Sequence, residues 1–256
     1  LNTVCEEAGC PNIYECWGES TATFMINGSR CTRACGFCLV DTQQPEPINT
    51  EEPHHVAQAV EQMGLSHVVI TAVARDDLDD GGASGFVKTL RSIRKRVPEV
   101  SVEILIPDFR GRVDALECVL AEQPDVVNHN LETVARLQRA VRSNAGYARS
   151  LTLLARAKER GLITKSGLMT GLGETDGELI SALGDLACVG VDIVTIGQYL
   201  RPTTDHLPVQ RWVNPETFQM LAERARELGF RHVEAGPLTR SSHKAARGLR
   251  SFTTTA

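Results

Sequence analysis

The chain alternates short runs rich in β-branched residues with longer segments of helical period, and this alternation limits the possible folds more than any other feature. Two parallel strands need a crossover connection between them, usually a helix. We predict six strands, at residues 22–26, 67–73, 100–106, 125–127, 163–169 and 192–196. Six such units with right-handed crossovers curl into an α/β barrel or partial barrel, and an open doubly wound sheet is the alternative.

The predicted helices follow these strands, at residues 53–63, 85–96, 112–121, 131–142 with 148–160, 177–188 and 215–228. In barrels of this type the active site is built from the loops at the C-terminal ends of the strands. No linker separates two domains of similar size. We therefore assign residues 21–235 to the barrel, residues 1–20 to an N-terminal extension and residues 236–256 to a C-terminal extension.

The composition excludes several classes of protein. The 256 residues are 42% hydrophobic and 23% charged, as in globular proteins, and the net charge of −5 has the wrong sign for coating nucleic acid. No stretch approaches the roughly 18 apolar residues of a membrane span. We expect neither a nucleic-acid nor a membrane partner, and a bacterial-type cytoplasmic location. Because the chain begins at Leu1, not Met, we expect missing N-terminal residues, so a mitochondrial or plastid matrix stays the alternative.

The cysteines are clustered, since six of the eight lie within the first 38 residues. Such clustering indicates either a disulfide framework or a metal site. Disulfide frameworks belong mainly to small secreted proteins, whereas a chain of this size stabilises itself by burying a core. Metal ligation is therefore the better explanation.

The first cysteine set to consider is Cys31, Cys35 and Cys38, in the sequence CTRACGFC directly after the first predicted strand. A [4Fe–4S] cluster normally takes four thiolates, so three leave one iron open to an outside ligand. Structural zinc takes four ligands, and ferredoxins use a different spacing. The motif resembles that of the radical S-adenosylmethionine (SAM) superfamily. The resemblance implies a partial (β/α)6 barrel and SAM bound to the open iron.

A second set, Cys5, Cys10 and Cys16, lies upstream in CEEAGCPNIYEC and is again one ligand short of a closed site. A second cluster is the natural inference. Near the other end the chain reads GPLTRSSHKA, with Ser241 and Ser242. Together these motifs resemble the lipoyl synthase family, whose R-S-S serine completes an auxiliary [4Fe–4S] cluster. By position in the motif we favour Ser242 as that ligand, with Ser241 as the alternative.

The resemblance extends over nearly the whole chain, through ARDDLDDGG, IPDFRG, HNLET, TGLGET and IGQYLRPT. One departure is His243, where the family commonly has Tyr. The resemblance implies two [4Fe–4S] clusters, SAM, and insertion of two sulfur atoms at C6 and C8 of a protein-bound octanoyl-lysine, with the auxiliary cluster as sulfur source.

The same resemblance implies three kinds of partner. The substrates are octanoylated lipoyl carrier domains, either the glycine cleavage H protein or 2-oxoacid dehydrogenase acyltransferase domains. The electrons come from a one-electron reductase such as ferredoxin or flavodoxin. An iron–sulfur carrier rebuilds the auxiliary cluster.

Five polar residues are candidates for SAM binding: Thr71, Asp77, Glu103, Asn130 and Lys165. For Thr71 and Asp77 the resemblance implies this role, because radical SAM enzymes bind the cofactor's amino group after the second strand. The other three are polar residues within or at the ends of apolar predicted strands. A buried polar group needs a partner, and a bound cofactor supplies one. The alternatives are an ordinary surface turn for the Asp77 segment and an internal Glu103–Lys165 ion pair.

Three further features are assigned no catalytic or cofactor-binding role. Cys118 and Cys188 each lie alone in an amphipathic segment, so we expect buried apolar thiols. The basic run at residues 91–96 is typical of a solvated helix face, with docking of an acidic carrier as the alternative. Residues 171–174 lack the third glycine of a dinucleotide-binding motif, which argues against a nicotinamide site.

Overall fold

The structure is a computed structural model that describes residues 2–3 and 12–253. Its strands follow one another in the sheet in chain order, from β1 to β8. Neighbouring strands in the sets β2–β3–β4 and β6–β7–β8 are parallel, whereas β1 runs antiparallel to β2. The predicted α/β fold is confirmed. The contacts divide the chain into two units, which are described separately.

The first unit comprises residues 1–33, 40–127 and 244–246. Its strands are β1 (Asn2–Thr3), β2 (Thr21–Ile26), β3 (His67–Ala72) and β4 (Ser101–Leu105). Its helices are α2 (Ile13–Gly18), α3 (Glu52–Gln62), α4 (Ala83–Arg96), the 3-10 turn η1 (Phe109–Gly111) and α5 (Val113–Leu120). The short strand β5 (Val126–Asn128) ends where the second unit begins.

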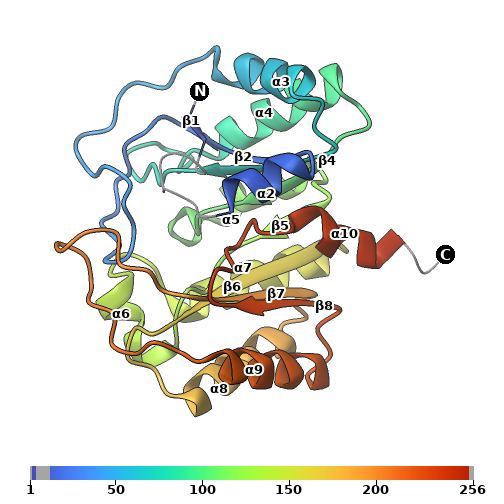
Figure 1. The fold of residues 1–256 in the computed structure, drawn as a ribbon. Coiled ribbons are helices and arrows are strands. Elements are labelled where there is room, and N and C mark those ends of the chain that lie inside the picture. The colour runs from blue at the N-terminus through green and yellow to red at the C-terminus, as the bar shows by residue number, and fades with distance from the viewer. Residues whose placement is uncertain (1, 4–11, 254–256) are drawn as a thin grey trace. The chain divides into compact units, whose positions relative to one another are not determined.

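The two faces of this first set of strands differ in polarity. Register aligns Phe24, Ile70 and Ile104 in one row, and all three are buried. Helices α3 and α4 lie side by side against these strands (Figure 1). The buried residues of each helix form an apolar stripe. Register aligns Met25, Thr71 and Leu105 on the opposite face, and Glu103 also lies there, because strand side chains alternate. Polar candidates therefore share one face of the sheet.

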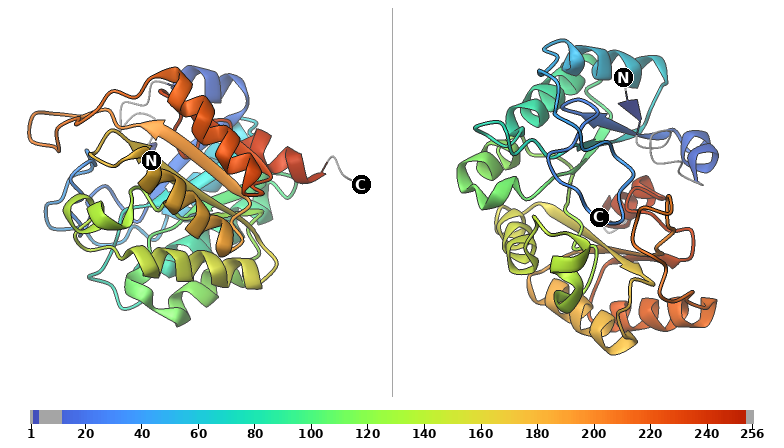
Figure 2. Two further views of the ribbon diagram at one scale, coloured as in Figure 1. Left: turned by 90° about the horizontal axis from the view of Figure 1, so that it is seen from below. Right: turned by 90° about the vertical axis from the view of Figure 1, so that its left-hand side faces the viewer.

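The second unit comprises residues 34–39, 128–243 and 247–256. Its strands are β6 (Ile163–Thr170), β7 (Ile193–Gln198) and β8 (His232–Gly236). Its helices are the 3-10 turn η2 (Ala135–Leu137), α6 (Gln138–Val141), α7 (Tyr147–Glu159), α8 (Asp176–Cys188) and α9 (Pro215–Glu227), and most of α10 (Ala245–Thr253) belongs to it as well. Helix α8 begins with a capping box in which Thr175 and Glu178 bond each other's backbone N–H. Two further views show how these helices flank their strands (Figure 2).

All six predicted strands are present, but two predictions about secondary structure are wrong. Strand β8 was not predicted, because its five residues contain one β-branched side chain and every position is half-buried. The helix predicted at residues 131–142 is reduced to η2 and α6. Glu132 has a φ of +69° and Val134 is extended, so the chain cannot be helical there.

The expected burial of Cys118 and Cys188 is also wrong, since both side chains are exposed. In α5 the buried stripe consists of Ala115, Leu116, Val119 and Leu120, which leaves position 118 on the outer face. Cys188 is the last residue of α8 and lies beyond the buried stripe of that helix. A small apolar side chain in an amphipathic helix does not by itself reveal which face it occupies.

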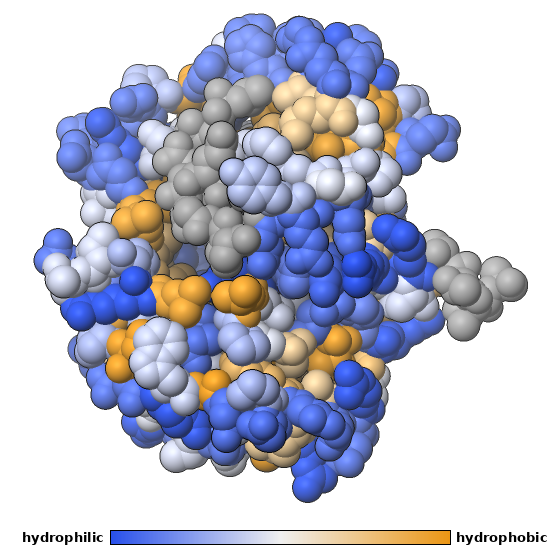
Figure 3. Space-filling model, viewed as in Figure 1, coloured by the Kyte–Doolittle hydropathy of each residue, from blue (hydrophilic) through white to orange (hydrophobic). Residues whose placement is uncertain are grey.

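The surface seen in Figure 3 is mainly hydrophilic, and its apolar residues gather in small patches. The largest exposures of apolar side chains among the described residues include Tyr14 at 89% and Trp212 at 69%. Scattered exposed apolar residues of this kind are ordinary on a protein surface. Within the described part of the chain, no helix has the length and apolar character required to cross a bilayer.

Candidate active site

Cys31 lies in the first unit, in the loop that follows β2. Its backbone N–H donates to the carbonyl of Asp41 at 2.8 Å, which fixes the loop. Its Sγ accepts N–H groups from Arg33 at 3.4 Å and Ala74 at 3.3 Å. Hydrogen bonds to cysteine sulfur tune iron–sulfur clusters. The half-buried Cys31 side chain therefore has the surroundings expected of a cluster ligand.

Arg33 joins the cysteine loop to the loops after β3 and β4. Its guanidinium makes a two-pronged contact with Asp76, with both N···O distances at 2.8 Å, and a further contact with Asp108 at 2.7 Å. Burial acts to lower the pKa of Arg33, but the hydrogen bonds and charges of the two carboxylates outweigh it and raise the pKa above its ordinary value. The Arg33 side chain is therefore buried, stays charged and links the three loops.

The loop after β3 is held by a second arginine. Arg75 donates to Asp77, with Nη2 at 2.8 Å from Oδ2, and to the carbonyl of Asn27 at 3.0 Å. The hydrogen bond from Arg75 lowers the pKa of Asp77, so this carboxylate stays ionised. Thr71 on β3 donates its hydroxyl to the carbonyl of Leu105 at 3.0 Å. Both candidates thus have protein partners, and their contacts with SAM stay predictions.

Glu103 and Lys165 are buried within β4 and β6. In the first unit, Nε2 of the His67 ring lies 3.8 Å from Oε2 of Glu103. That distance is too long for a hydrogen bond. The cofactor role of these two residues and the alternative Glu103–Lys165 pair stay predictions.

Cys35 and Cys38 lie in the second unit, and both are half-buried. The N–H of Cys38 donates to the carbonyl of Cys35 at 3.1 Å, so the CGFC sequence forms a tight turn. Phe37, between them, packs against an apolar cluster of Val141, Leu172 and Tyr199. This packing aims the intervening ring inward, while the turn sets the spacing of the two thiols.

Asn130 follows β5 and provides a test for a bound ligand in the second unit. Its Nδ2 donates to Glu132 at 3.0 Å, whereas its Oδ1 is buried and accepts no hydrogen bond from any described residue. A Cβ at Gly167 would lie 2.8 Å from that oxygen, so the glycine keeps the space around it open. Buried acceptors are normally satisfied. The unpaired amide oxygen of Asn130 is available to accept a hydrogen bond from a bound cofactor, which is consistent with the predicted contact between Asn130 and SAM.

The auxiliary set is described only in part, because Cys5 and Cys10 lie outside the described residues. Cys16 is half-buried on α2, and Ser242 is half-buried in the turn before α10. In residues 2–3 and 12–253, no three His, Cys, Asp or Glu side chains are placed to hold a single metal ion. A cubane differs from a single ion because each of its thiolates binds a different iron. The donor types fit [4Fe–4S] clusters.

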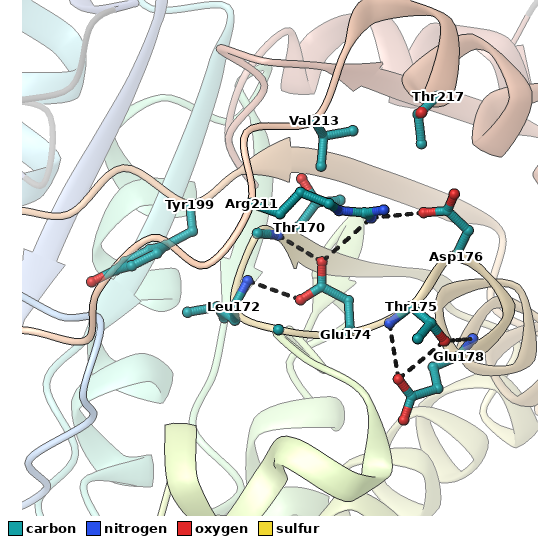
Figure 4. A network of polar contacts seen from close by, with 12 residues as sticks. Thr170, Leu172, Glu174, Thr175, Asp176, Glu178, Tyr199, Arg211, Val213 and Thr217 are labelled. Atoms are coloured by element: carbon teal, nitrogen blue, oxygen red, sulfur yellow. Dashed lines mark hydrogen bonds and ion pairs between the residues drawn. The ribbon is translucent and has the colours of Figure 1, made fainter.

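Glu174, which supports the turn after β6, was missed by the sequence analysis. Its carboxylate accepts the N–H groups of Gly171 at 2.6 Å and Leu172 at 2.9 Å, directly after β6 (Figure 4). Arg211 lies nearby, 4.0 Å from Glu174 and 2.6 Å from Asp176. The signal was the sequence at 171–174, which we compared only with dinucleotide-binding motifs. Its carboxylate shapes the turn at the end of a strand, where a barrel binds its ligand.

Gln198, the last residue of β7, holds the segment that leads to α9. Its Nε2 donates to the carbonyl of Arg211 at 3.1 Å, and its Oε1 accepts the N–H of Val213 at 3.0 Å. The N–H of Gln210 also donates to the carbonyl of Gly171 at 2.8 Å. The segment 210–213 is therefore bound to the ends of β6 and β7.

The fold and these loops can be compared with known proteins. The family model for the radical SAM superfamily matches residues 25–186. The lipoyl synthase of Rubrobacter xylanophilus is 56% identical over 247 residues, which are 96% of this chain and 77% of that protein. The lipoyl synthase of Symbiobacterium thermophilum is 58% identical with the same coverage.

Among solved structures, methylornithine synthase has the same kind of fold, with a TM-score of 0.61 at 15% identity. The match covers 81% of this chain and 62% of that one, and it agrees with the predicted partial barrel. Likeness at this identity concerns the fold alone, whereas the two lipoyl synthases are similar in sequence over 96% of this chain. By that similarity the chain belongs to the lipoyl synthase family of the radical SAM superfamily.

Proposed function

We propose that the protein inserts sulfur at C6 and C8 of an octanoyl group carried on a lysine, which produces a lipoyl group. The observation that carries the proposal is the identity of 56–58% to lipoyl synthases over 96% of the chain. When bound, SAM and one cluster supply a 5′-deoxyadenosyl radical that abstracts hydrogen, and a second cluster supplies sulfur. The protein's own residues bind and orient these groups.

Cys31, Cys35 and Cys38 hold the first cluster in this proposal. The support is their spacing and their anchored loop, in which two N–H groups reach the sulfur of Cys31. Asn130 supplies an acceptor for SAM, since its buried Oδ1 has no partner among the described residues. The other candidates are Thr71 on β3, Asp77 in the loop after β3, Glu103 on β4 and Lys165 on β6.

The auxiliary cluster is assigned to Cys5, Cys10, Cys16 and Ser242, with Ser241 as the alternative. One contact supports bringing the two chain ends together. Lys244, two residues after Ser242, lies 3.7 Å from Glu15, the residue before Cys16. A serine oxygen is a poorer ligand for iron than a thiolate, which suits a cluster that must release sulfur.

The partners follow from the reaction. The substrate is an octanoylated carrier domain, either the glycine cleavage H protein or an acyltransferase domain of a 2-oxoacid dehydrogenase. Each SAM cleavage consumes one electron, so a reductase such as ferredoxin or flavodoxin is required. An iron–sulfur carrier must then restore the consumed cluster.

The proposal is tested with anaerobically reconstituted protein, dithionite, SAM and an octanoyl-lysyl peptide. Cys31→Ala should abolish 5′-deoxyadenosine formation, whereas Cys16→Ala should preserve it and stop thiolation. Each variant should hold about four irons, against about eight in the parent protein. Cys118→Ala is the matched control, because Cys118 is exposed and outside both sets.

A second candidate is a radical enzyme whose auxiliary cluster only binds substrate. It predicts multiple turnovers with no loss of acid-labile sulfide. Equal loss of SAM cleavage in Cys31→Ala and Cys16→Ala would contradict the division of roles between the two clusters. Zinc without sulfide would contradict the radical chemistry altogether.

A further inference from the structure

The turn of residues 203–207, between β7 and α9, lies against the cysteine loop within the second unit, and we call this turn the strap. His206 Nε2 lies 2.9 Å from the carbonyl oxygen of Cys38. The N–H of Leu207 donates to the carbonyl of Gly36 at 2.9 Å. The strap therefore binds the backbone of the CGFC turn at two points, one of them on a predicted cluster ligand.

Both ring nitrogens of His206 have hydrogen-bond partners. A carbonyl oxygen can only accept, so Nε2 carries the proton that it donates to Cys38. The other nitrogen, Nδ1, lies 2.8 Å from Thr203 Oγ1. The two partners fix both the tautomer and the orientation of the imidazole.

The strap is rigid enough to act as a support. The Thr203 hydroxyl also accepts the N–H of Asp205 at 3.2 Å, and Arg201 donates from Nε to the carbonyl of His206 at 2.9 Å. Arg201 makes a second hydrogen bond to the carbonyl of Thr204. Pro202 and Pro208 flank this network, and each fixes its own φ angle. These contacts hold the turn that carries the His206 ring.

Packing adds to these hydrogen bonds. The Tyr199 hydroxyl donates to the carbonyl of Leu207 at 2.8 Å, and its ring belongs to the apolar cluster that receives Phe37. A Cβ at Gly36 would lie 2.8 Å from the Leu207 side chain, so that side chain packs directly against Gly36. The strap and the CGFC turn share one small core.

We infer that His206 is a positioning residue for the SAM-binding cluster: its Nε2–H holds the peptide of Cys38 so that the thiolate is aimed at iron. This inference rests on the proposed function, because it requires Cys38 to be a cluster ligand. Groups that orient metal ligands typically change metal affinity by about 10–100-fold when they are removed. Hydrogen bonding around the ligands also sets cluster potential.

The test uses the full chain carrying Cys16→Ala, so that the iron measured belongs to the SAM-binding cluster. In this background His206→Ala should release iron to a chelator about 10-fold faster, without oxygen or SAM. His206→Gln should restore slow release, because its amide places an N–H donor near the same position. Thr203→Val keeps the imidazole ring but removes the hydroxyl bonded to Nδ1, so its rate of iron release should lie between those of His206→Ala and His206→Gln. His55→Ala on α3 is the matched control, since His55 is exposed.

The midpoint potential of the cluster separates positioning from a merely structural role. It should shift in His206→Ala and return toward the parent value in His206→Gln, while the unfolding temperatures of the three metal-free proteins stay close together. The inference would be overturned if His206→Ala and His206→Gln released iron at the same rate and had the same midpoint potential. A background protein that takes up no iron at all would overturn the proposed function instead.

Discussion

Glu174 offers the most direct test of how the turn after β6 is held. Its carboxylate accepts two backbone N–H groups at 2.6 and 2.9 Å and is 5% exposed. In Glu174→Gln, one oxygen remains as an acceptor, but the new NH2 group opposes the second N–H. Each hydrogen bond to a charged group contributes about 1.5–3 kcal/mol, so weakening one and losing the other costs about 3 kcal/mol. For a chain of this size that lowers Tm by about 6–12 °C.

The assay is thermal unfolding of the metal-free protein, followed by circular dichroism. Glu178→Gln is the matched control, because it makes the same chemical change four residues away at an exposed capping box. It should lower Tm by much less. If Glu174→Gln unfolds within error of the parent protein, or no earlier than Glu178→Gln, the assignment of Glu174 as the support of this turn is refuted.

Two further predictions concern backbone space and pH. Gly197→Ala places a Cβ 2.1 Å from the carbonyl oxygen of Thr239, so the neighbouring R-S-S segment must move. Limited proteolysis of that segment should therefore be faster. Gly184→Ala is the control and should not change the rate of proteolysis, because a Cβ there meets no atom within 4 Å. Burial raises the pKa of Glu132 despite the opposing effects of Arg142 and Asn130, so the folded state binds the proton more tightly than the unfolded state. Stability should therefore fall as pH rises above the ordinary Glu range. Above that range Glu132→Gln should gain stability relative to the parent, measured by urea unfolding.

The strands were predictable because buried parallel strands are nearly continuous β-branched runs, as in β3, where His67–Ala72 contains two valines, an isoleucine and a threonine. Strand β8 has no such run, and its pairing with β7 is what makes it a strand. The segment after β5 shows the opposite error. Its apolar spacing predicts a helix, but Glu132 lies in the left-handed region and pairs with Asn130. Tertiary contacts outweigh local periodicity at both places.

The cysteine motif was predictable because its chemistry depends on spacing along the chain. The supporting contacts were not, because Arg33 meets Asp76 and Asp108 across 43 and 75 residues of sequence. No local pattern announces which of several arginines will be buried between carboxylates. Glu174 was close to the motif that we examined, yet its role appears only when the N–H groups after β6 are seen to converge on it.

The amide of Gln198 has one more consequence. By donating to Arg211 and accepting from Val213, it offers that segment the same pair of bonds that a neighbouring strand would offer. Residues 211 and 213 are therefore hydrogen-bonded in the manner of a β-sheet neighbour, although this segment is not a strand. The amide hydrogen of Val213 should exchange with solvent as slowly as those of β7. Trp212, which lies between the two bonded residues, is exposed, so its fluorescence should report whether these hydrogen bonds are formed.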